Sequence, residues 1–177
     1  MTNTSFDDFI KQRSEVSKKA EIDWQAECDK WKKHLSEFHD KVEGFLKPYT
    51  DSHKLKVTRK KVDLHEEYIG SYKADALDIL LGNTKITLKP IGTNIIGAKG
   101  RVDMIGPRGI VRFVLVSRDS NGPKISVQIG KQSKEVSSEE KIEPILEWKI
   151  STSSPRISYM ELVEESFQTA LMEVVNG

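Results

Sequence analysis

The chain of 177 residues lacks the features that mark secreted and membrane proteins. Its single cysteine cannot form a disulfide within the chain, which is typical of proteins in a reducing compartment. The longest apolar runs, such as the stretch from Ile110 to Val116, are too short and too charged to span a bilayer. The first eight residues lack the basic and apolar regions of a secretion signal. We therefore expect a cytoplasmic protein with no membrane partner.

Motifs that bind metals or cofactors are also lacking. His34 and His39 lie five residues apart in a helical pattern, so they point about 140° away from each other, and one cysteine cannot complete a structural zinc site. The glycine-rich segment 91–100 matches neither common phosphate-binding loop, and it leads into a predicted strand instead of a helix. Cys28 shares a helical face with two tryptophans, which is typical of a buried apolar residue. The sequence thus predicts no cofactor, no metal and no catalytic residue.

What the sequence does contain is a long amphipathic pattern near its N-terminus. From Phe9 to Phe45, apolar residues recur every three or four positions if the stem of Arg13 is included, and no glycine or proline precedes Gly44. The pattern predicts one helix that ends between Gly44 and Pro48. A helix of about 40 residues would be about 60 Å long, whereas a compact body of the remaining size is about 30–35 Å across. We therefore expect part of the apolar stripe to extend beyond its own domain.

The centre of this stripe carries residues that are typical of an interface. Trp24, Cys28, Trp31 and Leu35 follow one another at steps of four, three and four, and Phe38 continues the same face. Tryptophan is enriched at protein interfaces, so we interpret these five as partner-binding residues. The partner is another protein or a second copy of the chain, and we expect a homo-oligomer. Packing of the same side chains on a sheet of their own chain is the equally weighted alternative. A run of steps of four near Val16 would interrupt the heptads of a coiled coil.

The middle of the chain, from about residue 53 to residue 152, is rich in strand patterns. Alternation in the segments 76–81 and 85–90 places apolar side chains on one face and polar side chains on the other. Short turns that contain glycine, asparagine or proline separate the segments, so we expect an antiparallel meander of six or seven strands. The predicted strands are 54–64, 76–81, 85–90, 99–105, 110–118, 124–130 and 142–151, with a solvated loop at 131–141.

A second helix is predicted at the C-terminal end. Ser158 and Glu161 fit the spacing of a capping box, and an apolar stripe from Val163 to Val174 follows. The predicted fold class is α+β, with a long N-terminal amphipathic helix, an antiparallel β-meander and a C-terminal helix packed on the sheet. We expect an interaction helix over residues 1–48 and a sheet domain over residues 49–177.

Positive charge is concentrated in the middle of the chain. Residues 51–112 carry a net charge of +5, whereas the segments before and after carry −1 and −3. Such an excess is found on the solvated face of a sheet, where lysines protect an edge strand, and also on surfaces that bind nucleic acid. The candidate nucleic-acid-binding residues are Lys56, Arg59, Lys60, Lys99, Arg101, Arg108 and Arg112.

One hairpin suggests an enzyme. Gly100-Arg101-Val102-Asp103, a turn and the segment 110–118 resemble the active-site hairpin of the PD-(D/E)xK nucleases, in which carboxylates hold Mg²⁺ and a lysine assists the attacking water. Asp103 matches the family's metal-binding aspartate. The position of the Glu-x-Lys motif holds Val116-Ser117-Arg118, so the second carboxylate is missing. We therefore expect a non-enzymatic protein-interaction module, with a nucleic-acid-binding accessory protein as the alternative.

Overall fold

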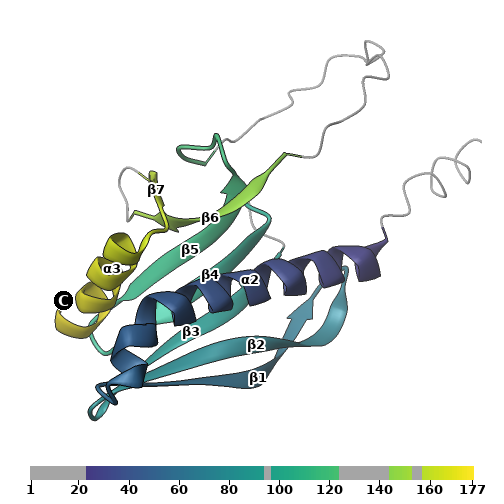
Figure 1. Ribbon diagram of the computed structural model, residues 1–177. Helices are drawn as coiled ribbons and strands as arrows, with labels where there is room; N and C mark the ends of the chain where they lie inside the picture. Colours follow the sequence, from purple (N-terminus) through teal and green to yellow (C-terminus); the bar gives the residue numbers. More distant parts are fainter. Residues whose placement is uncertain (1–22, 94–96, 124–143, 153–156) are drawn as a thin grey trace, which may run out of the picture.

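The computed structural model describes residues 23–93, 97–123, 144–152 and 157–177, and it contains two helices and one sheet within these ranges (Figure 1). Both helices lie on the same face of the sheet. The helices are α2 (Trp24–Asp51) and α3 (Glu164–Asn176). The strands are β1 (Lys56–Glu66), β2 (Gly70–Leu81), β3 (Thr84–Gly92), β4 (Gly100–Ile105), β5 (Ile110–Ser117), β6 (Leu146–Ser151) and β7 (Tyr159–Glu161).

The sheet is the antiparallel meander that the turn pattern predicts. Its strands follow the chain order from β1 to β7, and every neighbouring pair is antiparallel. Gly82 supplies the positive φ of 57° at the tight turn between β2 and β3, a conformation that glycine adopts without steric cost. The predicted fold class, α+β with helices on an antiparallel sheet, is confirmed. The predicted strand 124–130 and loop 131–141 lie outside the described residues.

Helix α2 extends further than the sequence pattern predicts at its C-terminal end. Asp23 caps the first turn by accepting a 3.0 Å hydrogen bond from the backbone N–H of Ala26. The helix does not end between Gly44 and Pro48 but continues to Asp51, with Pro48 inside it. Gly44 and Pro48 are both exposed, so water can reach the carbonyl that the missing proline N–H leaves without a helical partner. The predicted part of the helix before residue 23 lies outside the described residues.

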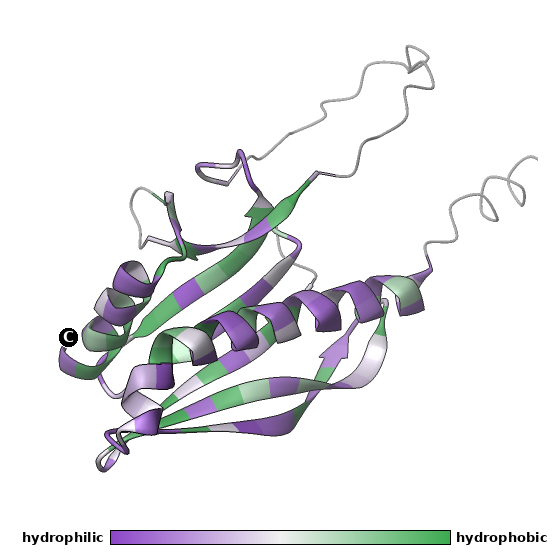
Figure 2. Cartoon of the chain, in the orientation of Figure 1, coloured by the Kyte–Doolittle hydropathy of each residue, from purple (hydrophilic) through white to green (hydrophobic). Residues whose placement is uncertain are grey.

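The core lies between the two helices and one face of the sheet. Alternate residues of the central strands, such as Ile86 and Leu88 on β3, are fully buried beneath α2 and α3. Phe38 of α2 contacts both Phe113 of β5 and Trp148 of β6, with ring centroids 5.2 and 4.7 Å apart. Figure 2 shows the same division, since apolar colour follows the strands beneath the helices and polar colour follows the outer side of α2.

The C-terminal helix begins later than the sequence predicts. Ser158 and Glu161 do not form a capping box, because Tyr159–Glu161 forms strand β7 and pairs with β6. The helix begins at Glu164, where the hydroxyl of Ser166 accepts a hydrogen bond of 3.0 Å from the backbone N–H of Val163. The apolar stripe is confirmed in part: Phe167, Ala170 and Val174 are buried and Leu171 is half-buried, whereas Val163 precedes the helix and is exposed. No helix in the described part of the chain combines the length and apolar character needed to cross a membrane.

Candidate functional site

A pocket of about 560 Å³ opens at the N-terminal end of α2. It lies between the first turns of α2, the turn that joins β1 to β2, and the strand ends of β5 and β6. Its volume falls in the range of pockets that hold a small ligand or the side chains of a partner. The lining combines aromatic, aliphatic and charged side chains: Trp24, Glu27, Lys30, Trp31, His34, Glu66, Tyr68, Ile69, Thr93, Lys99, Leu115, Pro144 and Leu146.

The rim of the pocket carries two exposed aromatic side chains. Trp24 begins α2, and Tyr68 lies in the turn between β1 and β2. Their rings are stacked, with centroids 5.1 Å apart and planes inclined by 14°. Trp24 is 38% exposed and Tyr68 is 56% exposed, so this pair offers a large apolar surface to solvent. Exposed aromatic pairs of this kind are typical of protein-binding surfaces.

The floor of the pocket is built by Trp31, whose ring lies close to Gly100 at the start of β4. A Cβ atom added to Gly100 would come within 2.2 Å of the Trp31 ring, so only glycine permits this approach. Trp31 is 2% exposed and tilts against Trp148, with ring centroids 5.9 Å apart. The indole N–H of Trp148 donates a 2.9 Å hydrogen bond to the carbonyl of His34. The floor of the pocket is therefore part of the hydrophobic core.

One wall of the pocket is fixed by the carboxylate of Glu66 at the end of β1. It accepts hydrogen bonds from the hydroxyl of Tyr72, from the backbone N–H of Thr93 at 2.9 Å and from the Thr93 hydroxyl at 2.7 Å. Burial and the hydrogen bond to Glu66 raise the pKa of Tyr72 well above its usual range, so this phenol stays protonated. A Cβ at Gly92 would lie 2.8 Å from the Glu66 carboxyl carbon. The network links the end of β1 to β2 and to the residue that follows β3.

The structure separates the five predicted partner-binding residues into two groups. Only Trp24 is exposed. The other four lie in the core of their own chain, each 2% exposed or less: Cys28, Trp31, Leu35 and Phe38. The intrachain alternative therefore holds for the stripe from Cys28 onward, because the sheet covers it. The sequence could not separate the two readings, since a helical face gives the same pattern whether its cover is a sheet or a partner.

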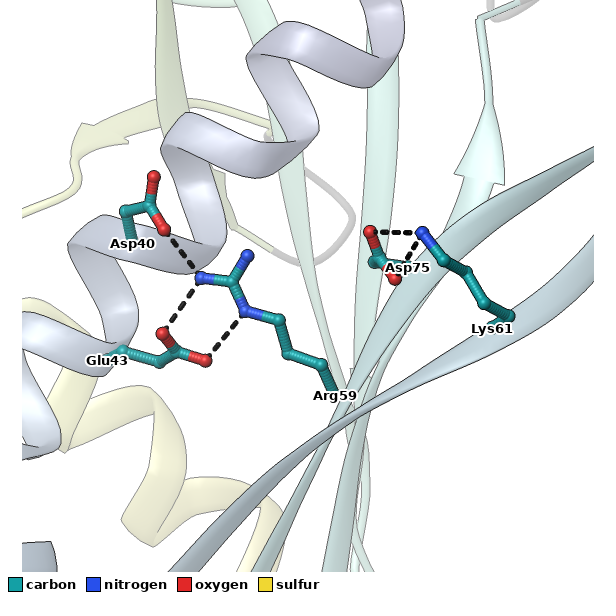
Figure 3. Close-up of polar contacts among 5 residues, drawn as sticks. All are labelled: Asp40, Glu43, Arg59, Lys61 and Asp75. Atoms are coloured by element: carbon teal, nitrogen blue, oxygen red, sulfur yellow. Dashed lines mark hydrogen bonds and ion pairs between the residues drawn. The ribbon is translucent and has the colours of Figure 1, made fainter.

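A cluster of ionic groups fastens α2 to the edge strand β1. Arg59 lies between Asp40 and Glu43, with nitrogen–oxygen distances of 2.5 and 2.8 Å (Figure 3). The hydrogen bond to Glu43, more than the one to Asp40, raises the pKa of Arg59 above its usual value. Lys61 pairs with Asp75 at 2.9 Å beside this clamp. Arg59, a predicted nucleic-acid-binding residue, is therefore occupied by two carboxylates of its own chain.

His39 lies fully buried beside this cluster. Neither of its ring nitrogens has a hydrogen-bond partner among the described residues. Burial lowers the pKa of His39 to about 4, and the positive charge of Arg59 adds to this effect, while Asp75, Glu43 and Asp40 oppose it. The imidazole is therefore neutral at physiological pH. The sequence pattern favours a surface position for the histidines, and for His39 this is wrong, because a polar residue four positions after Leu35 can also turn toward the core.

The other predicted basic residues do not all lie on a single face. Lys56 and Lys60 lie on β1, Lys99 lines the pocket, and Arg108 lies in the turn after β4, where its backbone N–H donates to the Val174 carbonyl of α3 at 2.9 Å. Arg101 and Arg112 alternate with buried residues on β4 and β5, so they point away from the helices. Two further lysines on this outer face, Lys85 and Lys89, were not among the predicted residues, although the alternation within 85–90 indicated them.

The hairpin formed by β4 and β5 has the predicted pairing, and an arginine of the same strand holds its aspartate. Both carboxylate oxygens of Asp103 accept hydrogen bonds from Arg101, at 2.6 and 2.7 Å. Arg112 lies directly opposite Asp103 in the register of the hairpin, and Lys89 lies opposite it on β3. Within the described residues there is no group of three or more acidic, histidine or cysteine side chains that could hold a metal ion.

Comparison with known proteins returned no match to a family model, to a curated protein or to a solved structure.

Proposed function

We propose that this protein is a non-enzymatic interaction module that associates with a second copy of itself through the N-terminal end of α2. The observation that carries the proposal is the exposed stack of Trp24 on Tyr68 at the rim of a 560 Å³ pocket. Burial of such an apolar surface in an interface would favour association by roughly 25 cal/mol for each Å² removed from water.

The charges around the pocket support a second copy as the partner. A two-fold interface joins the same patch of both copies, so a patch that carried charge of one sign would repel itself. The lining avoids this, because its charges balance: Glu27 pairs with Lys30 of the same chain at 3.2 Å, and Glu66 and Lys99 are of opposite sign. A strongly charged partner would instead be bound by a patch whose charges all have the opposite sign.

The proposal narrows the interaction surface that the sequence predicts. The sequence pattern assigned the whole stripe from Trp24 to Phe38 to a partner, whereas this proposal assigns only the end of the helix. Trp31 contributes as the buried floor of the pocket and not as an exposed anchor. Replacement of Trp31 would therefore perturb folding as well as association, and it is unsuitable as a test.

The test is the solution mass of the chain by size-exclusion chromatography with light scattering, from about 1 to about 200 µM. We expect a concentration-dependent species of twice the chain mass of 20.1 kDa. The double variant Trp24→Glu/Tyr68→Glu should be monomeric throughout, because charges would replace the apolar rim. The matched control is Tyr49→Glu, which changes a tyrosine with 37% exposure at the other end of α2 and should leave the dimer intact. A wild-type protein that stays monomeric, or a double variant that still dimerises, would contradict the proposal.

A further inference from the structure

The outer face of the sheet, opposite the two helices, carries an excess of positive charge. Among the described residues, no helix covers this face (Figure 1). Side chains that alternate with the buried ones on β2 to β5, together with Lys60 of β1, form what we call the outer basic patch. Its cations are Lys60, Lys85, Lys89, Arg101 and Arg112.

Only two carboxylates lie among these five cations, and both are already engaged. Asp78 pairs with Lys60 at 2.8 Å and with Lys85 at 3.0 Å, and it also accepts a 2.7 Å hydrogen bond from Thr87. Asp103 is held on both oxygens by Arg101. The patch therefore has an excess of three positive charges. Lys89 and Arg112, which flank Asp103 on the neighbouring strands, are exposed and make no ion pair within the described residues.

The spacing of the patch is set by the sheet. Lys89 and Arg112 stand two strands apart, or about 10 Å, and Lys85 and Lys89 are four residues apart, or about 13 Å along β3. A groove of duplex DNA separates its two backbones by about 6–12 Å. The charges can therefore reach the phosphates on both sides of one groove. Ion pairs within the patch also hold Lys60, Lys85 and Arg101 in place, which lowers the entropy lost on binding.

The composition of the patch indicates which form of nucleic acid it fits. Proteins that bind single strands stack the bases on aromatic rings. The outward residues of β2 to β5 include no aromatic side chain; they are aliphatic, hydroxyl-bearing or charged, as with Thr87 and Ile110. Contacts to phosphates alone fix a protein on a duplex without reading its sequence.

We propose that the outer basic patch binds the phosphate backbone of double-stranded nucleic acid, independently of sequence. This surface lies on the opposite side of the sheet from the helices and is distinct from the pocket that we assign to self-association. If three phosphates are neutralised, the slope of log K against log salt concentration is about −2.7, and the affinity falls about 40-fold between about 50 and 200 mM salt.

The test is fluorescence anisotropy with labelled DNA and RNA duplexes and with a single strand of the same sequence, each about 20 nucleotides long. We expect duplex binding with the slope given above. The variant Lys89→Glu/Arg112→Glu should weaken it at least ten-fold at about 50 mM salt and flatten the slope to about −1, because two of three contacts are lost. The matched control is Lys33→Glu/Lys41→Glu on the exposed side of α2, which makes the same change in net charge and should leave binding unchanged.

The remaining outcomes decide against the proposal. No duplex binding at low salt would overturn it, as would an equal loss in both charge-reversed variants, since that result would reflect net charge alone. Tighter binding to the single strand would overturn the assignment to a duplex. Binding to anionic phosphatidylserine vesicles without binding to either duplex would assign the patch to a lipid surface instead. If the charge reversal prevents folding, Lys89→Gln/Arg112→Gln serves in its place, with the thermal unfolding transition as the check on folding.

Discussion

The buried histidine of α2 makes the stability of the fold depend on pH. His39 has no exposed surface, and its pKa is lowered from 6.5 to about 4, chiefly by burial. In the unfolded chain the same imidazole takes up a proton near pH 6.5. Between these two values the unfolded state therefore binds a proton that the folded state does not bind. The stability contributed by this group is full above about pH 6.5 and is lost as the pH falls toward 4.

The size of the effect follows from the two pKa values. Between about pH 7.5 and about pH 4.5, the protonation of His39 in the unfolded state lowers the free energy of unfolding by roughly 2.5 kcal/mol. Carboxylates also titrate in this range, so the contribution of His39 must be isolated by substitution. The variant His39→Leu removes the titration and replaces an unpartnered polar ring with an apolar side chain, which should be close to neutral at about pH 7.5.

The assay is urea denaturation followed by tryptophan fluorescence, at about pH 7.5 and about pH 4.5. We expect the free energy of unfolding of His39→Leu, relative to the wild type, to rise by roughly 2–3 kcal/mol between the two conditions. The matched control is His65→Leu, which changes an exposed histidine on β1 and should show a much smaller difference. A difference for His39→Leu that does not change with pH would show that burial of His39 does not lower its pKa. So would an NMR titration of His39 in the folded protein with a midpoint near 6.5.

Three further predictions concern the packing around the pocket and the edge strand. Gly100→Ala should destabilise the fold by about 1–3 kcal/mol in urea denaturation, because the added Cβ would meet the Trp31 ring at 2.2 Å. The control Gly109→Ala should leave the stability unchanged, because nothing lies within 4 Å of the added Cβ, and equal effects of the two variants would contradict the prediction. Arg59→Ala should lower the free energy of unfolding by about 1–2 kcal/mol, and by less at high salt, because it removes the ion pairs with Asp40 and Glu43. Lys61→Ala, which removes the pair with Asp75, should lower it by less than about 0.5 kcal/mol. An Arg59 variant as stable as the wild type would show that its ion pairs contribute nothing to stability. Ultraviolet titration should show the Tyr72 phenol still protonated when the exposed tyrosines have ionised, so Tyr72→Phe should give the same curve in that range; a curve that loses the amplitude of one tyrosine would contradict the raised pKa.

The order of the strands was predictable because it follows from local chemistry. The short turns fix antiparallel neighbours, and the alternation around Ile86 and Leu88 identifies the buried face before any tertiary contact is known. The start of the last helix was not predictable in the same way. Ser158 and Glu161 satisfy the spacing of a cap, but pairing of Tyr159–Glu161 with β6 wins over that local preference.

The candidate site was only partly predictable. The helical spacing identifies Trp24 and Trp31 as residues of one face. It does not show that Trp24 lies at the rim of a pocket and that Trp31 forms its floor. The pocket also needs Tyr68 and Glu66, which approach the helix only through the path of the β1–β2 hairpin. The outer basic patch depends on the register of five strands, which brings Lys89, Asp103 and Arg112 into one row. A count of charges along the sequence cannot reveal such a row.

The most direct test of self-association through the pocket is the distance between spin labels in the intact protein, measured by pulsed electron paramagnetic resonance. A label at Glu67→Cys lies beside Tyr68 at the rim, and a label at Tyr49→Cys lies about 38 Å along α2 from Trp24. Both variants carry Cys28→Ala so that only the introduced thiol reacts. The account predicts a short distance between the two copies for the label at position 67 and a much longer distance, or none, for the label at position 49. A short distance at position 49, or no distance at position 67, would contradict it.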